Sequence, residues 1–203
     1  MGLGWCCFRN YAAHAEEIGG DISEEYPRFF LKPASAHVEA DENGNNVIEL
    51  MNEEDHIDHE AELVVRLGDD LRPEAMCIGC DTTNRTRQTI AKNKRWPWTE
   101  GKAFRGSGVL GTWTQYQDGV LQVSMKVNGE TKQDATTSLM IHSVEDLVEH
   151  LSAWYDLSPG DLVWTGTPAG VGPMYKGDFV EAYLTNQKGE IVSRLNANCV
   201  VNG

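Results

Sequence analysis

An α+β fold rich in short strands is predicted by three patterns in this chain of 203 residues. Apolar and polar residues alternate from Glu60 to Leu67, which indicates a strand. Asn128-Gly129 ends a second segment of period two and is typical of a tight hairpin turn. A helix is expected after Ser143, but no regular strand–helix–strand alternation surrounds it. Because no linker interrupts the chain, we expect a single domain over 1–203.

The first half of the chain contains fewer clear elements. Asn10 is expected to cap a short helix from Tyr11 to Ile18, which Gly19-Gly20 would end. A strand is expected from Arg28 to Leu31. Acidic residues are dense from Glu39 to Glu62, and most of that stretch is predicted to be a solvated loop. Residues 82–94 are expected to contain a helix with a Thr or Asn cap.

The second half has stronger signals. Strand periodicity from Gly119 to Val127 leads into the hairpin turn. Ser143 and Asp146 form a predicted capping box, and the helix that follows has one apolar face. That face consists of Val144, Leu147, Val148, Leu151 and Tyr155. Strands and glycine-rich turns are expected over 162–201.

Composition excludes several classes of protein. Lys and Arg number 17 against 31 Asp and Glu, which gives a net charge of −14. This balance argues against nucleic-acid partners and against binding to an anionic membrane. No apolar run approaches the roughly 20 residues of a membrane span, and no secretory signal is evident. The five unevenly spaced cysteines do not indicate a disulfide framework, so we expect a cytoplasmic protein.

A pair of carboxylates suggests a metal site. Glu60 and Glu62 would project from one face of the predicted strand, where they repel each other unless a cation or a proton intervenes. Asp81 follows the apolar run 76–80 and is a candidate third ligand. Oxygen ligands suit Mg²⁺, Mn²⁺ or Ca²⁺. The alternative is an edge strand with solvent-facing charges, with Asp81 serving as a turn or cap residue.

Other residues are candidates for catalysis. His14 and Glu17 would share a helix face, and a Glu that orients a His makes a general base. Lys102 and Arg85 are the cations that could bind a carboxylate or an oxyanion. The glycine-rich segment 165–173 lacks the features of a phosphate loop but could present N–H and hydroxyl groups to an anion. For each, the alternative is an ordinary surface pair, surface charge or tight turn.

The pair Cys77 and Cys80 has the spacing of a metal or redox motif. No second pair, histidine or surrounding strand–helix–strand unit supports such a role. We therefore expect both thiols in a buried strand.

Taken in order along the chain, several motifs resemble the fumarylacetoacetate hydrolase family. In the first half they are Arg9-Asn10-Tyr11 with His14 and Glu17, Phe29-Phe30-Leu31-Lys32-Pro33, His59-Glu60-Ala61-Glu62-Leu63, Asp81-Thr82-Thr83-Asn84-Arg85 and Lys102-Ala103-Phe104. In the second half they are Val127-Asn128-Gly129-Glu130 with Gln133, Thr137 and Met140-Ile141, then Leu157-Ser158-Pro159-Gly160-Asp161 and the segment 165–173. The resemblance extends from Arg9 to Gly189.

This resemblance implies a β-rich mixed sandwich or roll of the family's C-terminal domain type, usually assembled as a homodimer. Since few residues precede Arg9, the extra N-terminal domain of the longer fumarylacetoacetate hydrolases is not expected. The resemblance also implies roles for ten residues. Metal ligands for Mg²⁺ or Mn²⁺, with Ca²⁺ as a further option, would be Glu60, Glu62 and Asp81. Catalytic residues would be His14 and Glu17, on a lid-like segment, and Lys102. Substrate contacts would come from Arg9, Arg85, Gln88 and Thr167.

The short members that this chain resembles most are acylpyruvases and oxaloacetate decarboxylases. The resemblance therefore implies hydrolysis of a C–C bond in 2,4-dioxo acids, with decarboxylation of oxaloacetate through the same pyruvate enolate. One alternative is an isomerase or decarboxylase of 2-oxo diacids from aromatic catabolism, of the 2-hydroxyhepta-2,4-diene-1,7-dioate isomerase type. Fumarylpyruvate hydrolysis is a second alternative, and an inactive protein that binds 2-oxo acids is a third.

Three positions depart from the family's pattern. Thr86 stands where the family commonly has Asp, and Arg105 stands where it has Asp after Lys-x-Phe. Ala135 replaces the usual Gly two residues before Thr137. These departures leave the substrate preference open.

Overall fold

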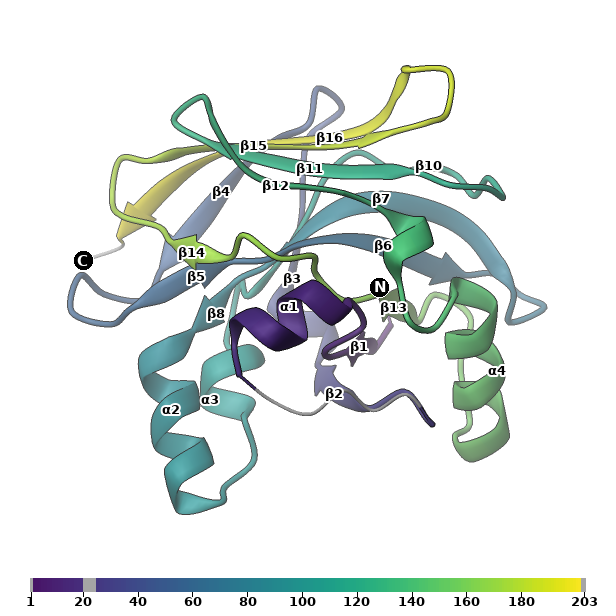
Figure 1. The fold of residues 1–203 in the computed structure, drawn as a ribbon, viewed down its shortest axis with the longest axis horizontal. Coiled ribbons are helices and arrows are strands. Elements are labelled where there is room, and N and C mark those ends of the chain that lie inside the picture. The colour runs from purple at the N-terminus through teal and green to yellow at the C-terminus, as the bar shows by residue number, and fades with distance from the viewer. Residues whose placement is uncertain (1, 20–24, 202–203) are drawn as a thin grey trace.

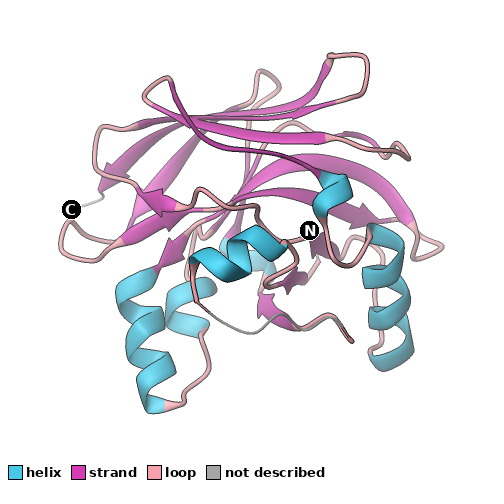
Figure 2. Cartoon of the chain, viewed as in Figure 1, coloured by secondary structure: helices cyan, strands magenta, loops and turns pink. Residues whose placement is uncertain are grey.

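The computed structural model describes residues 2–19 and 25–201. Strands form three sheets, and the α-helices gather along one side of the two larger sheets (Figures 1 and 2). The predicted α+β class, rich in short strands, is confirmed. No helix in the described part of the chain is long and apolar enough to cross a membrane.

The largest sheet has eight strands in the order β2-β1-β13-β6-β7-β9-β3, with β10 also paired to β7. These strands are β1 (Gly4–Cys7), β2 (Phe29–Lys32), β3 (His37–Glu39), β6 (Ala61–Leu67), β7 (Pro73–Asp81), β9 (Gly108–Leu110), β10 (Thr114–Gln115) and β13 (Leu162–Trp164). The first strand, β1, runs parallel to β13 and antiparallel to β2. Segments distant in sequence are therefore neighbours in this sheet.

The second sheet has five strands in the order β12-β11-β15-β16-β4. They are β4 (Asn45–Leu50), β11 (Gln122–Val127), β12 (Glu130–Thr136), β15 (Phe179–Thr185) and β16 (Ile191–Val201). Asn128 and Gly129 join β11 to β12 with φ angles of 52° and 80°, as a two-residue turn of the predicted kind requires. A small third sheet contains β14 (Gly172–Pro173), β5 (Ile57–His59) and β8 (Thr83–Asn84).

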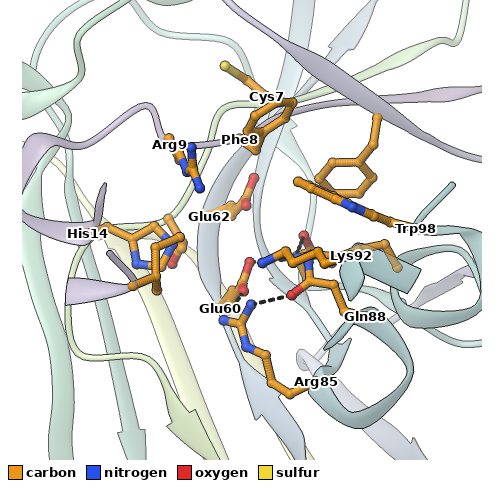
Figure 3. Close-up of a pocket in the computed structure, with 15 residues that line it drawn as sticks. Cys7, Phe8, Arg9, His14, Glu60, Glu62, Arg85, Gln88, Lys92 and Trp98 are labelled. Carbon is orange, nitrogen blue, oxygen red and sulfur yellow. Dashed lines mark hydrogen bonds and ion pairs between the residues drawn. The ribbon is translucent and has the colours of Figure 1, made fainter. Parts of the chain in front are cut away.

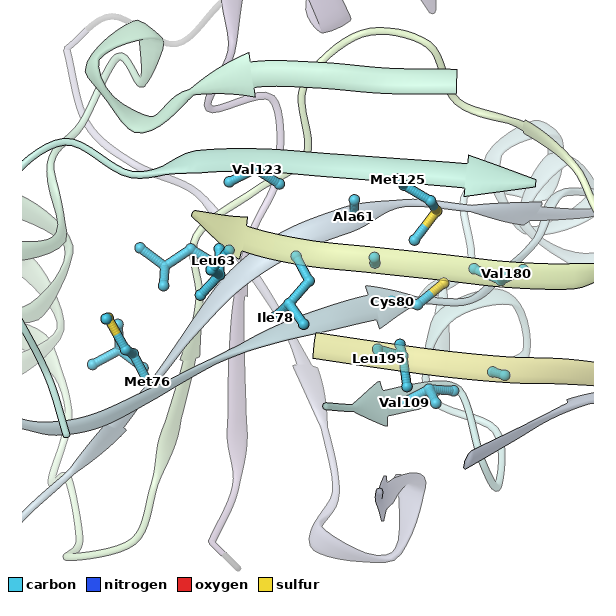
Figure 4. Packing of buried hydrophobic residues seen from close by; sticks show 14 of the residues in the cluster. Ala61, Leu63, Met76, Ile78, Cys80, Val109, Val123, Met125, Val180 and Leu195 are labelled. Atoms are coloured by element: carbon cyan, nitrogen blue, oxygen red, sulfur yellow. The ribbon is translucent and has the colours of Figure 1, made fainter. Parts of the chain in front are cut away.

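The main core lies between the two larger sheets (Figure 4). Ala61, Leu63 and Ile78 come from one sheet, and Val123 and Met125 come from the other. This is the apolar face predicted for the strand 60–67. The opposite face of the large sheet is covered too, because Val64, Cys77 and Trp164 pack in a second buried cluster there. All five cysteines are free and buried, as expected for a chain without disulfides.

The α-helices of the described residues are short. They are α1 (Ala12–Glu17), α2 (Arg85–Lys94), α3 (Thr99–Lys102) and α4 (Val144–Trp154), and there are short 3₁₀ turns at Ala34–Ala36 and Thr137–Leu139. The capping box of Ser143 and Asp146 is present at α4. Asn84 caps α2 by accepting a hydrogen bond from the Arg87 N–H, which confirms the predicted Asn cap.

Two local predictions are wrong. Asn10 does not cap α1, because its buried side chain is hydrogen bonded elsewhere and Tyr11 occupies the cap position. The acidic stretch is only partly a loop, because β4 runs through it and is paired with β16 along its whole length. Pairing with a strand distant in sequence decided this outcome, and the local charge density carries no signal of it. Gly20, expected to help end α1, lies outside the described residues.

Candidate active site

One pocket lies where β1, β6 and β7 meet α1, α2 and α3 (Figure 3). Its lining contains nine of the ten residues that the sequence nominated, and the tenth, Glu17, contacts His14. The nine are Arg9, His14, Glu60, Glu62, Asp81, Arg85, Gln88, Lys102 and Thr167. The fold thus brings together residues spread over about 160 positions of sequence. Their roles are still predictions.

Strand pairing brings the three acidic residues together. In the register of β6 and β7, Ala61 faces Cys80, and the Asp81 N–H donates to the Glu60 carbonyl at 2.8 Å. Glu60 and Asp81 are therefore opposite each other at the strand ends, with Glu62 on the same face. Their ligand oxygens lie within 4.8 Å of one another, and all three side chains are buried. The alternative of a solvent-exposed edge strand is wrong, because β6 lies between β13 and β7 and both of its faces are covered.

Glu60 and Glu62 have different electrostatic surroundings. Burial disfavours the charge on Glu60, but Lys102 at 2.7 Å and Arg85 at 2.6 Å outweigh it and lower the Glu60 pKa to about 2. Glu62 has no ion-pair partner among the described residues, and its hydrogen bond comes from the Gly166 N–H at 2.8 Å. Burial, then the charges of Asp81 and Glu60, raise the Glu62 pKa well above its usual value.

These residues fit a hard divalent cation. Three carboxylates offer only oxygen donors, and Oδ1 of Asp81 is buried without a well-directed hydrogen bond. A cation would relieve the mutual repulsion that raises the Glu62 pKa. The cavity bounded by these groups measures about 30 Å³, which suffices for about two water-sized groups. The acidic triad can therefore bind a metal ion.

His14 lies across the pocket from the helix that carries Arg85, Gln88 and Lys92 (Figure 3). Its Nδ1 is 3.2 Å from Oε2 of Glu17. Since a carboxylate only accepts, Nδ1 carries the proton and Nε2 remains an acceptor. Burial is the largest influence and lowers the His14 pKa, although Glu60 and Glu17 oppose it. The imidazole is therefore neutral at pH 7, as a general base must be.

Two buried lysines hold Asp81. Lys102 donates to Glu60 and Asp81 at 2.7 Å each and to Thr83 at 2.6 Å. Burial lowers the Lys102 pKa, but the charges of Asp81 and Glu60 outweigh burial, so the pKa is raised above its usual value. Lys32 lies 2.9 Å from the other Asp81 oxygen. It also donates to the Lys102 carbonyl and to Ser107. Sequence reasoning missed a role for Lys32, because a single lysine in a strand looks like an ordinary surface residue.

Arg85 is held by partners on the protein. It donates to Asp58 and Glu60 at 2.6 Å each and to Gln88 at 3.0 Å. Burial lowers the Arg85 pKa, but Glu60 and Asp58 outweigh burial and raise it above its usual value, so the guanidinium stays charged. Asp58 was not among the residues nominated from the sequence, and its position two residues before Glu60, on the same face, was the available signal.

Gln133, which the sequence placed in a family motif without a role, fixes the glycine-rich loop. Its amide N–H₂ donates to the Thr167 hydroxyl and the Pro168 carbonyl, both at 2.8 Å. Its amide oxygen accepts from the Ala61 N–H at 2.9 Å and lies 3.1 Å from Nδ1 of His59. Gln133 therefore ties the loop that carries Thr167 to the strand that carries Glu62.

The chain enters α1 through two unusual residues. Arg9 lines the pocket with a φ of 60°, a left-handed conformation that is uncommon for residues other than glycine. Asn10 holds this turn, because its side chain donates to the His142 and Thr165 carbonyls and accepts from the His142 N–H, at 2.8–2.9 Å. Such strained positions often occur at functional sites.

The departures from the family pattern lie outside the pocket lining. The Thr86 hydroxyl accepts from the His56 N–H at 2.9 Å. Arg105 is exposed and pairs with Glu49 at 2.9 Å. Neither residue contacts the acidic triad.

Residues 4–196 match the family described as fumarylacetoacetate (FAA) hydrolase C-terminal. The mitochondrial oxaloacetate tautomerase of Arabidopsis thaliana is 37% identical over 194 residues, which cover 89% of this chain and 85% of that protein. The mitochondrial oxaloacetate decarboxylase of Dictyostelium discoideum is 35% identical over 191 residues, covering 87% and 86%.

Among solved structures, fumarylpyruvate hydrolase from Pseudomonas aeruginosa in complex with Mn²⁺ and pyruvate is similar. It has a TM-score of 0.86 and 31% identity, with 98% of this chain and 90% of that chain covered. The family match and the shared fold show that this chain belongs to the fumarylacetoacetate hydrolase family.

Proposed function

We propose that this protein is a divalent-metal-dependent enzyme that hydrolyses a C–C bond in acylpyruvate-type 2,4-dioxo acids and also decarboxylates oxaloacetate. One observation carries the proposal. A buried, neutral histidine held by a carboxylate shares a pocket with a buried acidic triad and Lys102. The histidine can take a proton from water or from a carbon atom, and it lies beside a triad that can hold a Lewis-acidic metal ion.

The metal site of this proposal consists of Glu60, Glu62 and Asp81, with Mg²⁺ or Mn²⁺ as the ion and Ca²⁺ as a further option. The Mn²⁺ of the Pseudomonas relative supports this choice. Such an ion, when bound, polarises the 2-oxo group and carboxylate of a substrate.

In the hydrolytic reaction, Nε2 of His14 takes a proton from water, and the water oxygen bonds to C4 of the substrate. The C3–C4 bond then breaks, and its electron pair goes to C3 as the enolate of pyruvate. Protonation at C3 gives pyruvate, and the acyl group leaves as a carboxylic acid. Lys102 contributes positive charge beside the developing enolate. Arg9, Arg85, Gln88 and Thr167 are the proposed substrate contacts.

A second candidate is proton transfer on oxaloacetate between its keto and enol forms. The name of the Arabidopsis relative favours it. This reaction needs His14 as an acid and base at C3 but requires no attacking water. An isomerase of larger 2-oxo diacids would use the same proton transfer, whereas a binding protein without turnover would not need a neutral His14.

Three broader expectations belong with this proposal. We propose one catalytic domain over 1–203, a homodimeric assembly and a cytoplasmic location. Light scattering of the purified protein tests the assembly, and fractionation of cells expressing the untagged chain tests the location.

The decisive experiment measures pyruvate from acetylpyruvate and oxaloacetate with metal-stripped protein, before and after addition of Mg²⁺ or Mn²⁺. Loss of the enol absorbance of oxaloacetate is recorded in parallel, because it reports tautomerisation without pyruvate formation. Free metal ions accelerate oxaloacetate breakdown, so the Glu62→Gln variant at equal metal concentration serves as the blank. Metal-restored pyruvate from acetylpyruvate supports the hydrolase. Enol loss alone supports the tautomerase, and no effect of metal on either substrate would refute the proposal.

A further inference from the structure

A recess with mainly apolar and aromatic walls adjoins the candidate active site, between β2 and the segment that joins α2 to α3. Its volume is about 410 Å³. The walls include Phe8, Phe29, Phe30, Leu31, Trp96 and Trp98. We call this feature the aromatic recess.

The aromatic recess lies next to the active-site pocket and shares four wall residues with it. Phe8, Phe30, Trp98 and Lys102 line both. The Trp98 ring lies 5.3 Å from the Phe8 ring and 6.3 Å from the Phe30 ring, measured between centroids. Figure 3 shows Phe8 and Trp98 among the side chains that line the pocket together with Glu62. A ligand whose head lies at the acidic triad therefore has aromatic side chains in the lining of the same pocket.

The inner cavity and the aromatic recess differ in volume. The inner cavity at the carboxylates measures about 30 Å³, whereas the aromatic recess measures about 410 Å³. The inner cavity suits a small polar head group. The recess has room for a chain of several carbon atoms or an aromatic ring.

The chemistry of the recess favours an uncharged tail. Among the described residues that form its walls, Lys102 alone is ionisable, and the ammonium group already donates to Glu60, Asp81 and Thr83. Its Nζ also lies 5.1 Å from the centre of the Phe30 ring, so this ammonium group is already engaged by the protein. Lys92 and Lys94 lie outside the recess walls, with their Nζ atoms 5.2 and 4.6 Å from the ring centres of Trp98 and Trp96, respectively. These two lysines would instead attract a tail that ends in a carboxylate.

We propose that the aromatic recess binds the apolar acyl chain or aryl group of substrates whose pyruvoyl head lies at the acidic triad. This inference rests on the proposed function and narrows its substrate class to 2-oxo acids with an extended apolar tail. Burial of a methylene is worth up to about fourfold in affinity, and about twofold when half of its surface stays in water. A chain five methylenes longer than pyruvate should therefore bind about 30-fold more tightly.

Calorimetric titration of the Mn²⁺-loaded protein with pyruvate, 2-oxohexanoate and 2-oxooctanoate tests this without turnover. The variant is Trp96→Ala, because Trp96 lines the recess but not the inner pocket and is 54% exposed, so folding does not depend on it. The matched control is Trp154→Ala on α4, where the ring is 72% exposed and outside both cavities. We expect the ratio of pyruvate Kd to 2-oxooctanoate Kd to fall at least threefold in Trp96→Ala and to stay unchanged in Trp154→Ala.

Each other result has a defined meaning. Equal Kd values along the series, with pyruvate bound, would overturn the recess and leave the proposed function intact. Tighter binding of 2-oxoadipate than of 2-oxohexanoate, which has the same chain length, would assign the tail to the lysines instead. A chain-length ratio that Trp96→Ala does not alter, together with loss of a dimer in light scattering, would make the recess a subunit contact. Absence of binding by all of these acids would refute the proposed function and this inference together.

Discussion

The carboxylate of Glu17 bridges His14 and the glycine-rich loop. One oxygen lies 3.2 Å from Nδ1 of His14, and the other accepts from the Gly170 N–H at 3.0 Å. His14 and the loop that carries Thr167 are thus fixed by one side chain. A movement of α1 would disturb both.

Substitution of Glu17 by Gln tests this link. The amide has a single acceptor oxygen, so it can accept only one of the two hydrogen bonds from His14 and Gly170. It also loses the charge that stabilises a protonated His14. We expect kcat to fall at least about tenfold, with Mn²⁺ affinity unchanged. Steady-state kinetics and calorimetry measure the two quantities. The exposed neighbour Glu16→Gln is the control, and an equal loss of activity there would contradict the assignment.

The dependence of activity on pH follows from His14. Its pKa lies below 6.5 because burial disfavours the imidazolium. A base must be unprotonated, so kcat/KM should be level near neutral pH and fall as the pH drops through that lowered pKa. Profiles recorded at saturating metal check this, and an acid limb centred above pH 7 would exclude His14 as the base. In Glu17→Gln the limb should move to still lower pH, because Glu17 raises the His14 pKa.

Glu62→Gln should change stability and metal binding in opposite directions. The raised pKa of Glu62 means that its charged form destabilises the folded protein above the unfolded-state pKa. At pH 7 the neutral amide should therefore stabilise the metal-free protein by about 1 kcal/mol or more. Mn²⁺ affinity should fall about 100-fold or more, and with it the metal-dependent rise in the unfolding temperature.

Thermal unfolding with and without Mn²⁺ measures both effects of that substitution. Glu149→Gln on α4 neutralises an exposed carboxylate and should change neither. A metal-free Glu62→Gln protein that is less stable than the wild type would show that burial and repulsion of the Glu62 charge do not destabilise the folded protein.

Two glycines in left-handed turns give a matched pair of substitutions. Gly170 has a φ of 98°, and a Cβ there would clash with the carbonyl oxygen of Lys132. Gly177 has a φ of 90° and open space around that position. Both Ala variants should lose about 1 kcal/mol of stability from backbone strain. Only Gly170→Ala should also displace the loop and lower kcat, so equal activities would show that the Glu17 link is dispensable.

Some secondary-structure elements could be predicted from the sequence alone, and others could not. The hairpin at Asn128 and the capped helix after Ser143 were predictable, because short-range rules determine them. The strand β4 was not, since its acidic surroundings suggested a loop and its partner β16 lies about 150 residues away. Likewise, the spacing of Glu60 and Glu62 could not distinguish an exposed edge from a buried site. That distinction depends on β13 and β7 on either side of β6.

The candidate site shows the same division. Residues in recognisable motifs could be nominated from the amino-acid sequence. Lys32, Asp58 and Gln133 could not be assigned contacts, because each acts through a partner that only the fold brings near.

The parallel pairing of β1 with β13 has a consequence for synthesis in the cell. Trp5 pairs with Val163, so β1 reaches this neighbour only after about 160 further residues have been translated. At about 5–20 residues per second this interval lasts roughly 8–30 s. Until then the nascent chain exposes one edge of β1. Aggregation of polysomes, or capture of β1 by a chaperone, is therefore the hazard that this topology creates for the newly made protein.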